Sequence, residues 1–335
     1  MKKAALRMGR YACVMAVGMA VATGAAAQSR AAEAAKDYPN RPIRLIVPAA
    51  AGGGTDIIAR LIAQQLSDAW GQTVVVDNRG GGGGTVGVTL AAKAAPDGHT
   101  MLLGSVGHLT FVPAVRSGLA YDTQKDLAPI SLAANQPFLI AVHPSVPVKS
   151  VKELLALARS RPGQIKYGSG GPGAASHLGV ALLELQTGVS MLHVAYKGSN
   201  PALIAVMGGE IEMALAGLAT ILPHTKSGKV RAIAVTGAKR AQVAPEIPTV
   251  AESGVAGYAF DVWYGLAFTG GTPRAIIAKA NAEIVKGLKS PELGKLFIAA
   301  GLEPLTSTPE EFTARIASEI ANWRKVVKAA NIKLE

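Results

Sequence analysis

The chain has 335 residues, of which 49% are hydrophobic and 17% are charged, and its formal net charge is +12. A chain this apolar can bury a substantial core, which excludes intrinsic disorder, and its length indicates about two domains. Only 5% of the residues are aromatic, which argues against the base-stacking surfaces of proteins that bind single-stranded nucleic acids.

Residues 1–27 have the pattern of a secretory signal peptide. Four basic residues with no acidic neighbour come first: Lys2, Lys3, Arg7 and Arg10. The uncharged stretch 11–27 is rich in Ala, Val, Met and Gly and ends in three alanines that suit a cleavage site. The alternative, a membrane anchor, is disfavoured because the stretch is barely long enough to span a bilayer and is weakly apolar.

Cleavage after Ala27 would change the charge and the chemistry of the mature chain. Of the 34 Lys and Arg residues, 30 would remain against 22 Asp and Glu, which gives a net charge of +8. Cys13, the one cysteine, would be removed, so disulfides, thiolate metal sites and cysteine nucleophiles are excluded. No second apolar run is long enough to span a bilayer, and we expect a soluble protein outside the cytoplasm.

The first part of the chain alternates short strands, glycine loops and helices. We predict strands over 43–47, 74–76 and 100–103, and helices over 55–70 and from about 85 to 95. The first helix places apolar residues on one face at helical spacing and stops at Gly71. This alternation predicts βαβ units with mainly parallel strands.

A second, similar set follows. Strands are predicted over 138–142 and 165–167, with later strands near 194, 211–215 and 232–235. Helices are predicted from Ser150, which forms a capping box with Glu153, to about 160, then over 174–186 and 201–207. The chain from Pro273 is predicted to be helical, with a last helix opened by a capping box at Thr308. Two such sets predict two α/β lobes.

Three glycine-rich loops stand between a predicted strand and a predicted helix: 52–54, 80–84 and 168–173. Glycine lets the backbone turn tightly, and the helix N-terminus that follows offers unpaired N–H groups to an anion. A single loop of this kind is better explained as a tight turn. Loops from different lobes that face each other across a cleft would favour ligand binding.

Two nucleotide-binding motifs are excluded. Gly82-x-Gly84-x-x-Gly87 matches the dinucleotide fingerprint, but a run of glycines makes the match almost automatic, and no acidic residue follows at the required position. No loop carries the Gly-Lys-Ser/Thr of a P-loop. We expect no cofactor.

Polar residues beside the loops have two interpretations each. Thr55 and Asp56 contact a ligand or cap their helix, and the residues alone leave both open. His108 and His177 follow glycine loops and are able to look into a cleft, although surface or core histidines are commoner. No two histidines and carboxylates have a zinc-site spacing, so no metal is expected.

The serines at strand ends do not have the setting of a nucleophile. Ser105 and Ser169 lie outside a G-x-S-x-G motif, and no pair of acids suggests general acid–base work. Anion-binding backbone without an activated nucleophile favours a binding protein over an enzyme.

Several ordered stretches along the mature chain form a family pattern: Tyr38-Pro39-x-Arg41-Pro42-Ile43, Gly52 to Arg60, Val76 to Arg79, Ala94 to Gly98, Tyr167 to Gly170, His177-Leu178, Tyr196-Lys197-Gly198, Val235-Thr236, Pro248 to Glu252 and Gly271-Thr272-Pro273. With these stretches the chain resembles the Bug family, the extracytoplasmic solute receptors of tripartite tricarboxylate transport systems.

The resemblance implies an α/β, two-lobed periplasmic binding protein of type II, the Venus-flytrap architecture, with a parallel-rich sheet in each lobe. Lobe 1 would hold 36–135 and 236–335, and lobe 2 would hold 136–235. The protein would be a periplasmic monomer that closes on a small carboxylate and passes it to membrane transporter subunits. The residues implied to bind the ligand are Ala49, Gly53, Gly54, Thr55, Asp56, Ser105, His108, Ser169, Gly170, Gly173, Ala174, His177, Tyr196 and Trp263.

The chain departs from the family pattern in both loops. Ala49 stands where relatives often have Phe, and Ala174 and Ala175 stand where they commonly have Ser or Thr. These changes remove side-chain contacts and leave backbone N–H contacts, so we expect a wider and more apolar pocket.

Two other functions remain as alternatives. One is a receptor that feeds a membrane sensor kinase with the same ligand chemistry. The other is an exported α/β hydrolase, for which Ser169 with His177 would be the pair to test.

Overall fold

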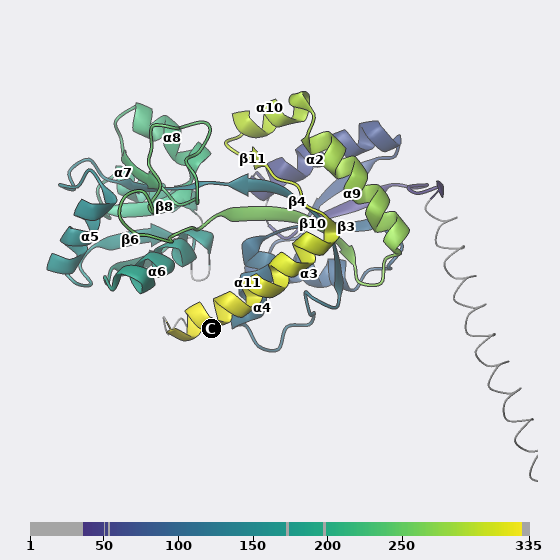
Figure 1. Ribbon diagram of the computed structural model, residues 1–335, viewed down its shortest axis with the longest axis horizontal. Coiled ribbons are helices and arrows are strands. Elements are labelled where there is room, and N and C mark those ends of the chain that lie inside the picture. Colours follow the sequence, from purple (N-terminus) through teal and green to yellow (C-terminus); the bar gives the residue numbers. More distant parts are fainter. Residues whose placement is uncertain (1–35, 50, 53, 172–173, 197–198, 330–335) are drawn as a thin grey trace, which may run out of the picture.

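The computed structural model describes residues 36–49, 51–52, 54–171, 174–196 and 199–329. The predicted signal peptide lies outside these residues. The described chain forms two β-sheets, each flanked by helices, that lie side by side (Figure 1).

Sheet one has six strands in the order β11-β4-β10-β3-β1-β2. Its strands are β1 Ile43–Val47, β2 Val74–Asn78, β3 Thr100–Ser105, β4 Leu127–Gln136, β10 Val262–Thr269 and β11 Glu303–Pro304. Its helical elements are α2 Gly54–Trp70, η1 Gly82–Gly84, α3 Thr85–Ala92, η2 Gly107–Phe111, α4 Val112–Val115, α9 Arg274–Leu288, α10 Pro291–Ala299 and α11 Pro309–Ala329.

Sheet two has five strands in the order β7-β6-β8-β5-β9. Its strands are β5 Phe138–Val142, β6 Lys166–Ser169, β7 Leu192–Ala195, β8 Met213–Gly217 and β9 Arg231–Val235. Its helices are α5 Val151–Ser160, α6 Ala175–Thr187, α7 Ser199–Met207 and α8 Leu218–Lys226.

Both sheets are mixed, where the sequence favoured mainly parallel pairing. β2, β1 and β3 pair in parallel, as do β7, β6 and β8. The remaining pairs, made by β4, β10 and β11 in sheet one and by β5, β8 and β9 in sheet two, are antiparallel. The strand–helix–strand units impose parallel pairing, whereas the strands that carry the chain between the sheets enter in the reverse direction.

The chain passes between the sheets twice. It leaves sheet one at the end of β4 and enters β5 one residue later, and it returns between β9 and β10 (Figure 1). β4 and β10 are paired along their length in the middle of the molecule. These crossings support the lobe boundaries near residues 135 and 235, which remain our proposal.

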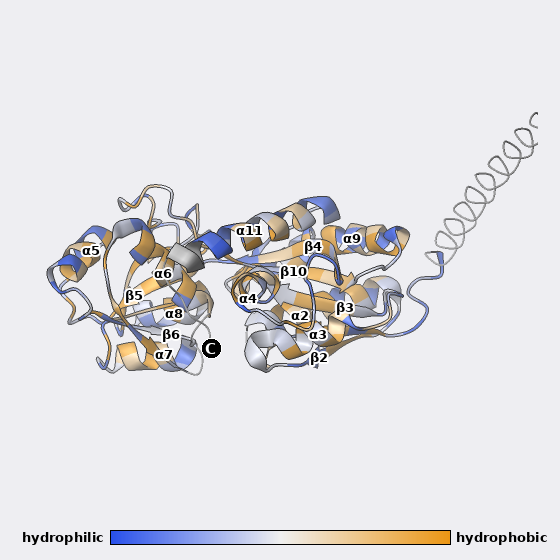
Figure 2. Cartoon of the chain, turned by 90° about the horizontal axis from the view of Figure 1, so that it is seen from below, coloured by the Kyte–Doolittle hydropathy of each residue, from blue (hydrophilic) through white to orange (hydrophobic). Residues whose placement is uncertain are grey.

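Helix α11 connects the two halves by packing. The ring of Trp323 makes edge-on contacts with Phe111, at 5.6 Å between centroids, and with Phe260, at 6.2 Å. In Figure 2, α11 extends from beside sheet one towards α6. Phe260 in turn lies 6.4 Å from Phe138 of β5, between ring centroids, so α11 is joined through Phe260 to the core of sheet two, which stabilises the arrangement of the two sheets.

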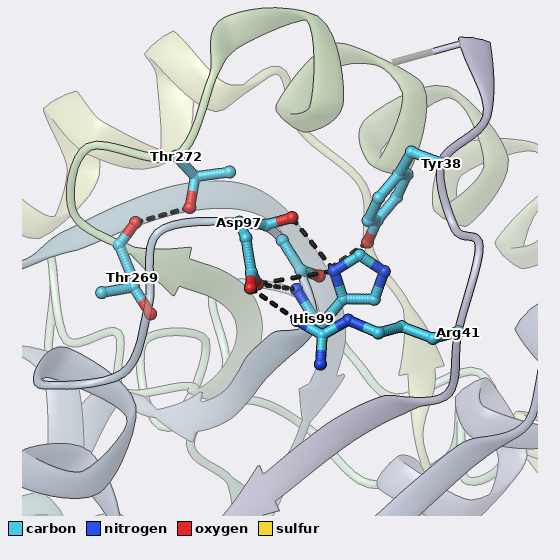
Figure 3. A network of polar contacts seen from close by, with 7 residues as sticks. Tyr38, Arg41, Asp97, His99, Thr269 and Thr272 are labelled. Carbon is cyan, nitrogen blue, oxygen red and sulfur yellow. Dashed lines mark hydrogen bonds and ion pairs between the residues drawn. The ribbon is translucent and has the colours of Figure 1, made fainter. Parts of the chain in front are cut away.

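One polar network lies at the N-terminal ends of β1 and β3 (Figure 3). The Tyr38 hydroxyl donates to the Gly98 carbonyl at 2.8 Å, and Arg41 pairs with Asp97 at 2.6 Å. Asp97 also accepts the backbone N–H of His99 at 2.9 Å. Because β1 and β3 run parallel, both strands begin beside this network and both end on the far side of the sheet from it. Part of the family pattern therefore serves the fold and not the ligand.

Candidate functional site

The candidate site is formed where parallel strands of both sheets end. In sheet one, β1 and β2 end together at Val47 and Asn78, and in sheet two β6 and β7 end together at Ser169 and Ala195. The loops that follow lead to α2 and α3 in one sheet and to α6, α7 and α8 in the other. In open α/β sheets, ligands bind at these carboxyl ends, where helix N-termini gather.

Asp56 braces the first glycine loop. Its Oδ2 atom accepts the backbone N–H of Gly52 at 2.9 Å and Arg60 Nε at 3.0 Å. The Asp56 residue is only 3% exposed. Burial raises the pKa of Asp56, but hydrogen bonds from Arg60, the Gly52 N–H and Asn78 outweigh burial and lower this pKa below its usual value.

The second glycine loop packs on the first through His108. A Cβ atom on Gly84 would lie 2.7 Å from His108 Nε2 and 3.1 Å from the carbonyl oxygen of Pro48. Gly84 also has a φ of +91°, so glycine is needed here for both space and backbone conformation. The Asn78 amide donates to the Ala49 carbonyl at 3.3 Å. Ala49 thus contributes to the loop through its backbone.

Hydrogen bonds fix the tautomer of His108. The backbone N–H of Ser105, which can only donate, lies 3.2 Å from His108 Nδ1, and the Ser105 hydroxyl lies 3.0 Å from the same atom. Nδ1 therefore accepts, and Nε2 carries the proton. Burial lowers the pKa of His108 to about 4, so the ring is a neutral N–H donor beside the glycine loops.

In sheet two, hydrogen bonds to the Ser169 hydroxyl hold the loop that follows β6. The Ser169 hydroxyl lies 2.6 Å from His193 Nε2 and accepts the N–H of Gly171 at 3.0 Å. The N–H of Gly170 donates to the Ser176 hydroxyl at 2.9 Å. Ser169 is paired with His193 and not with His177, the partner that the hydrolase alternative would require.

His177 belongs to an aromatic stack beside this loop. Its ring lies parallel to His193 at 4.2 Å between centroids, and the ring of Tyr167 lies 5.0 Å from His193 and 6.5 Å from His177. Burial, with a smaller contribution from His193, lowers the pKa of His177 to about 4. Burial also lowers the pKa of His193. The stack is neutral near pH 7.

Gln136 and Tyr264, which sequence reasoning missed, lie on the neighbouring strands β4 and β10 of sheet one, and the Gln136 side chain reaches sheet two. The Tyr264 hydroxyl donates to Gln136 Oε1 at 2.7 Å. A Cβ atom on Gly54 would lie 3.4 Å from Oε1, and one on Gly217 would lie 2.6 Å from Nε2. Gly54 begins α2 and Gly217 precedes α8, so one side chain touches the start of a helix from each sheet.

The structure places Trp263 away from these residues. Trp263 is fully buried, its Nε1 donates to both carboxylate oxygens of Glu319 at 2.9 Å, and Arg315 lies over its ring. This corrects the expectation that Trp263 lines the cleft. Side chains alternate along a strand, so the next residue, Tyr264, takes the opposite face and reaches Gln136.

Of the other residues expected at the site, some lie at the ends of its strands and helices and some lie outside the described chain. Thr55, the second residue of α2, is buried, and Tyr196 follows β7, where its N–H donates to the Ser169 carbonyl at 3.0 Å. Ala174 is the N-cap of α6. Gly53 and Gly173 lie outside the described residues.

Helix capping differs between the site and the outer helices. Side-chain hydroxyls cap α5 (Ser150), α10 (Ser290) and α11 (Thr308), as the sequence predicted for the first and third. At the site, the N-cap residues of α3, α6 and α8 are Gly84, Ala174 and Gly217, and none of the three helices has a side-chain cap. Of the outer helices, α9 also lacks one. The uncapped first turns of α3, α6 and α8 favour an anion, although the N–H of Leu218, the first residue of α8, already donates to the Pro137 carbonyl at 2.9 Å.

The described residues contain neither a metal-binding cluster nor a membrane-spanning helix. No cluster of three or more His, Cys, Asp or Glu side chains able to hold a metal ion occurs there. Within the same residues, no helix has the length and hydropathy needed to cross a bilayer.

Comparison with known proteins identifies the family. Residues 58–332 match the model of the tripartite tricarboxylate transporter family receptor. The chain belongs to this family. Protein BugT of Bordetella pertussis is 35% identical over 336 residues, which covers 98% of this chain and 100% of BugT. The resemblance drawn from the sequence is thereby confirmed.

Solved structures of receptor-family relatives have the same fold. The Rhodopseudomonas palustris protein Rpa4515, solved with adipate, is 36% identical and superimposes with a TM-score of 0.80 over 89% of this chain and 99% of its own. The periplasmic binding protein BugD is 34% identical with a TM-score of 0.77, over 89% of this chain and 100% of its own. The predicted two-lobed α/β periplasmic binding protein fold is confirmed. The family is one of solute-binding receptors.

Proposed function

We propose that this protein is a periplasmic receptor that captures a small carboxylate between its two sheets and delivers it to a tripartite tricarboxylate-type membrane transporter. The observation that carries this proposal is the set of uncapped helix starts at the facing strand ends, from sheet one at Gly84 and from sheet two at Ala174 and Gly217. A relative of the same family was solved with adipate, a dicarboxylate.

The chemistry of capture follows from these donors. An uncapped helix N-terminus offers unpaired N–H groups and a partial positive charge, which favour an anion. The neutral N–H of His108 adds a donor from sheet one. A carboxylate held by groups from both sheets stabilises their closed arrangement, and loss of water on closure strengthens each hydrogen bond.

The hydrolase alternative is disfavoured by the surroundings of Ser169. Ser169 is fully buried, and its hydroxyl already accepts the N–H of Gly171 and contacts His193 Nε2. A nucleophile needs an exposed oxygen and a base oriented by a third group. Among the described residues, no carboxylate hydrogen bond to His193 is present. We therefore propose binding without turnover.

The ligand is best sought with a thermal-shift screen of mono-, di-, tri- and aromatic carboxylates on the mature protein. A ligand present at about 100 times its Kd stabilises the folded state by roughly 2.7 kcal/mol. We expect a stabilising hit among the dicarboxylates, with adipate tested first, and no shift from the matched diamide. A receptor that no carboxylate stabilises would contradict the proposal.

Delivery is tested separately in transport. Membrane vesicles that contain the transporter subunits should take up labelled ligand only when the receptor is added. Uptake that does not depend on the receptor would refute delivery, while leaving carboxylate binding in place. Ligand-dependent activation of a sensor kinase in place of uptake would favour the sensor alternative.

A further inference from the structure

We infer that Gln136 is a binding residue for the ligand carboxylate, donating from Nε2, and that Tyr264 is the positioning residue that holds its amide. This inference rests on the proposed function and adds a donor that no glycine loop supplies. Gln136 is the last residue of β4, where the chain leaves sheet one for sheet two.

The position of the amide is set by contacts to both sheets. Its oxygen and nitrogen lie 3.4 and 3.6 Å from where a Cβ of Gly54 would be, at the start of α2. Its nitrogen lies 2.6 Å from where a Cβ of Gly217 would be, at the start of α8. Gln136 is half-buried, so its amide is shielded without being enclosed. A carboxylate that binds the N–H groups of either helix start therefore meets Gln136.

The orientation of the amide is set by Tyr264. Its hydroxyl donates to Oε1 at 2.7 Å, so the oxygen is occupied and the two protons of Nε2 remain for another acceptor. Burial strongly raises the pKa of Tyr264, which keeps its proton in place to donate, and the Thr55 hydroxyl contacts the same oxygen. Tyr264 is 5% exposed, and its ring is fixed by the surrounding core.

Gly217 supplies the room for this amide. Its φ of −57° and ψ of 137° are accessible to any residue, so the backbone does not require glycine. A side chain would instead push Nε2 away, because the Cβ would approach closer than van der Waals contact. The glycine at this helix start is explained by the amide beside it.

The test measures affinity for adipate by titration calorimetry on the full mature chain. Gln136→Met keeps the length of the side chain and removes the donors, and we expect affinity to fall about 10- to 100-fold, as for loss of a hydrogen bond to a charged group. Gln136→Glu should weaken binding further near pH 7 and recover as the pH falls, since the protonated carboxyl regains a donor. Gln64→Met, on the exposed side of α2, is the matched control and should bind as the wild type does.

Double variants separate positioning from general damage. Tyr264→Phe and Gly217→Ala should each weaken binding, and neither should weaken it further in the Gln136→Met background. Additive losses, or a Gln136→Met variant that binds within about twofold of the wild type, would overturn the inference. A wild-type protein that binds no carboxylate would instead refute the proposed function, so the two failures are distinguishable.

Discussion

The hydrogen bond from the Gly52 N–H to the Asp56 carboxylate tests how the first glycine loop is held in place. Asp56→Ala removes the hydrogen bond from the Gly52 N–H and the ion pair with Arg60. A hydrogen bond to a charged, buried acceptor contributes about 1.5–3 kcal/mol. Arg60 is 60% exposed, so its ion pair adds at most about 1 kcal/mol. We expect a loss of stability of about 2–3 kcal/mol near pH 7.

The same variant should weaken ligand binding, because a loop without its brace must be ordered when the ligand arrives. Ordering one residue costs about 1–2 kcal/mol, which corresponds to roughly a tenfold loss of affinity. Asp56→Asn keeps an acceptor for the Gly52 N–H and should retain affinity within about threefold. Arg60→Met, which leaves the Gly52 contact in place, should change neither property appreciably.

Chemical denaturation and calorimetry with adipate measure the two effects separately. The pKa of Asp56 is lowered in the folded protein, so its stabilisation is present above the unfolded pKa of about 3.9 and is lost as the pH falls through the folded value. The stability gap between the wild type and Asp56→Asn should therefore be constant above pH 5 and narrow below about pH 4. An Asp56→Ala variant that loses stability yet binds with unchanged affinity would show that Asp56 serves the helix alone.

Further predictions concern other parts of the site and its support. Gly84→Ala should destabilise the protein by more than about 1 kcal/mol, since φ is +91° and the new Cβ would overlap His108; a denaturation midpoint equal to wild type would refute this. Trp263→Phe should lower stability by about 1–3 kcal/mol through loss of the indole hydrogen bond to the Glu319 carboxylate, which keeps Arg315 as a partner, but leave ligand affinity unchanged. Weaker binding would restore Trp263 to the site. The pKa of His177 is lowered to about 4 in the folded protein from an unfolded value near 6.5, so the unfolded chain binds more protons between these two pH values. The free energy of unfolding should therefore fall as the pH drops from about 6.5 to about 4. An NMR titration that gives His177 a pKa near 6.5 in the folded protein would contradict this prediction.

Local patterns predicted most of the local structure. The capping boxes at Ser150 and Thr308 and the strand–loop–helix units around the first and third glycine loops are present, because each depends on residues a few positions apart. The strands β4 and β10 were missed. Both are largely buried on both faces, so their apolar runs lack the alternation that marks a strand.

The site was predicted only where a glycine loop marks it. Gln136 carries no motif, and its role depends on a strand that ends where the chain leaves sheet one for sheet two and on a tyrosine 128 positions away in sequence. The pairing of Ser169 with His193 depends on β6 lying beside β7, which no sequence spacing specifies. Trp263 was expected at the site only from the family resemblance, and the face on which its side chain lies depends on β10, which was not predicted.

A crystal structure of the mature protein with bound adipate tests the central claim most directly. We predict one ligand carboxylate within about 3 Å of backbone nitrogens in the first turns of α2 or α3 in sheet one and α6 or α8 in sheet two. A carboxylate held by the N-termini of one sheet alone, or bound outside the strand ends around Gly54 and Gly217, would contradict the account.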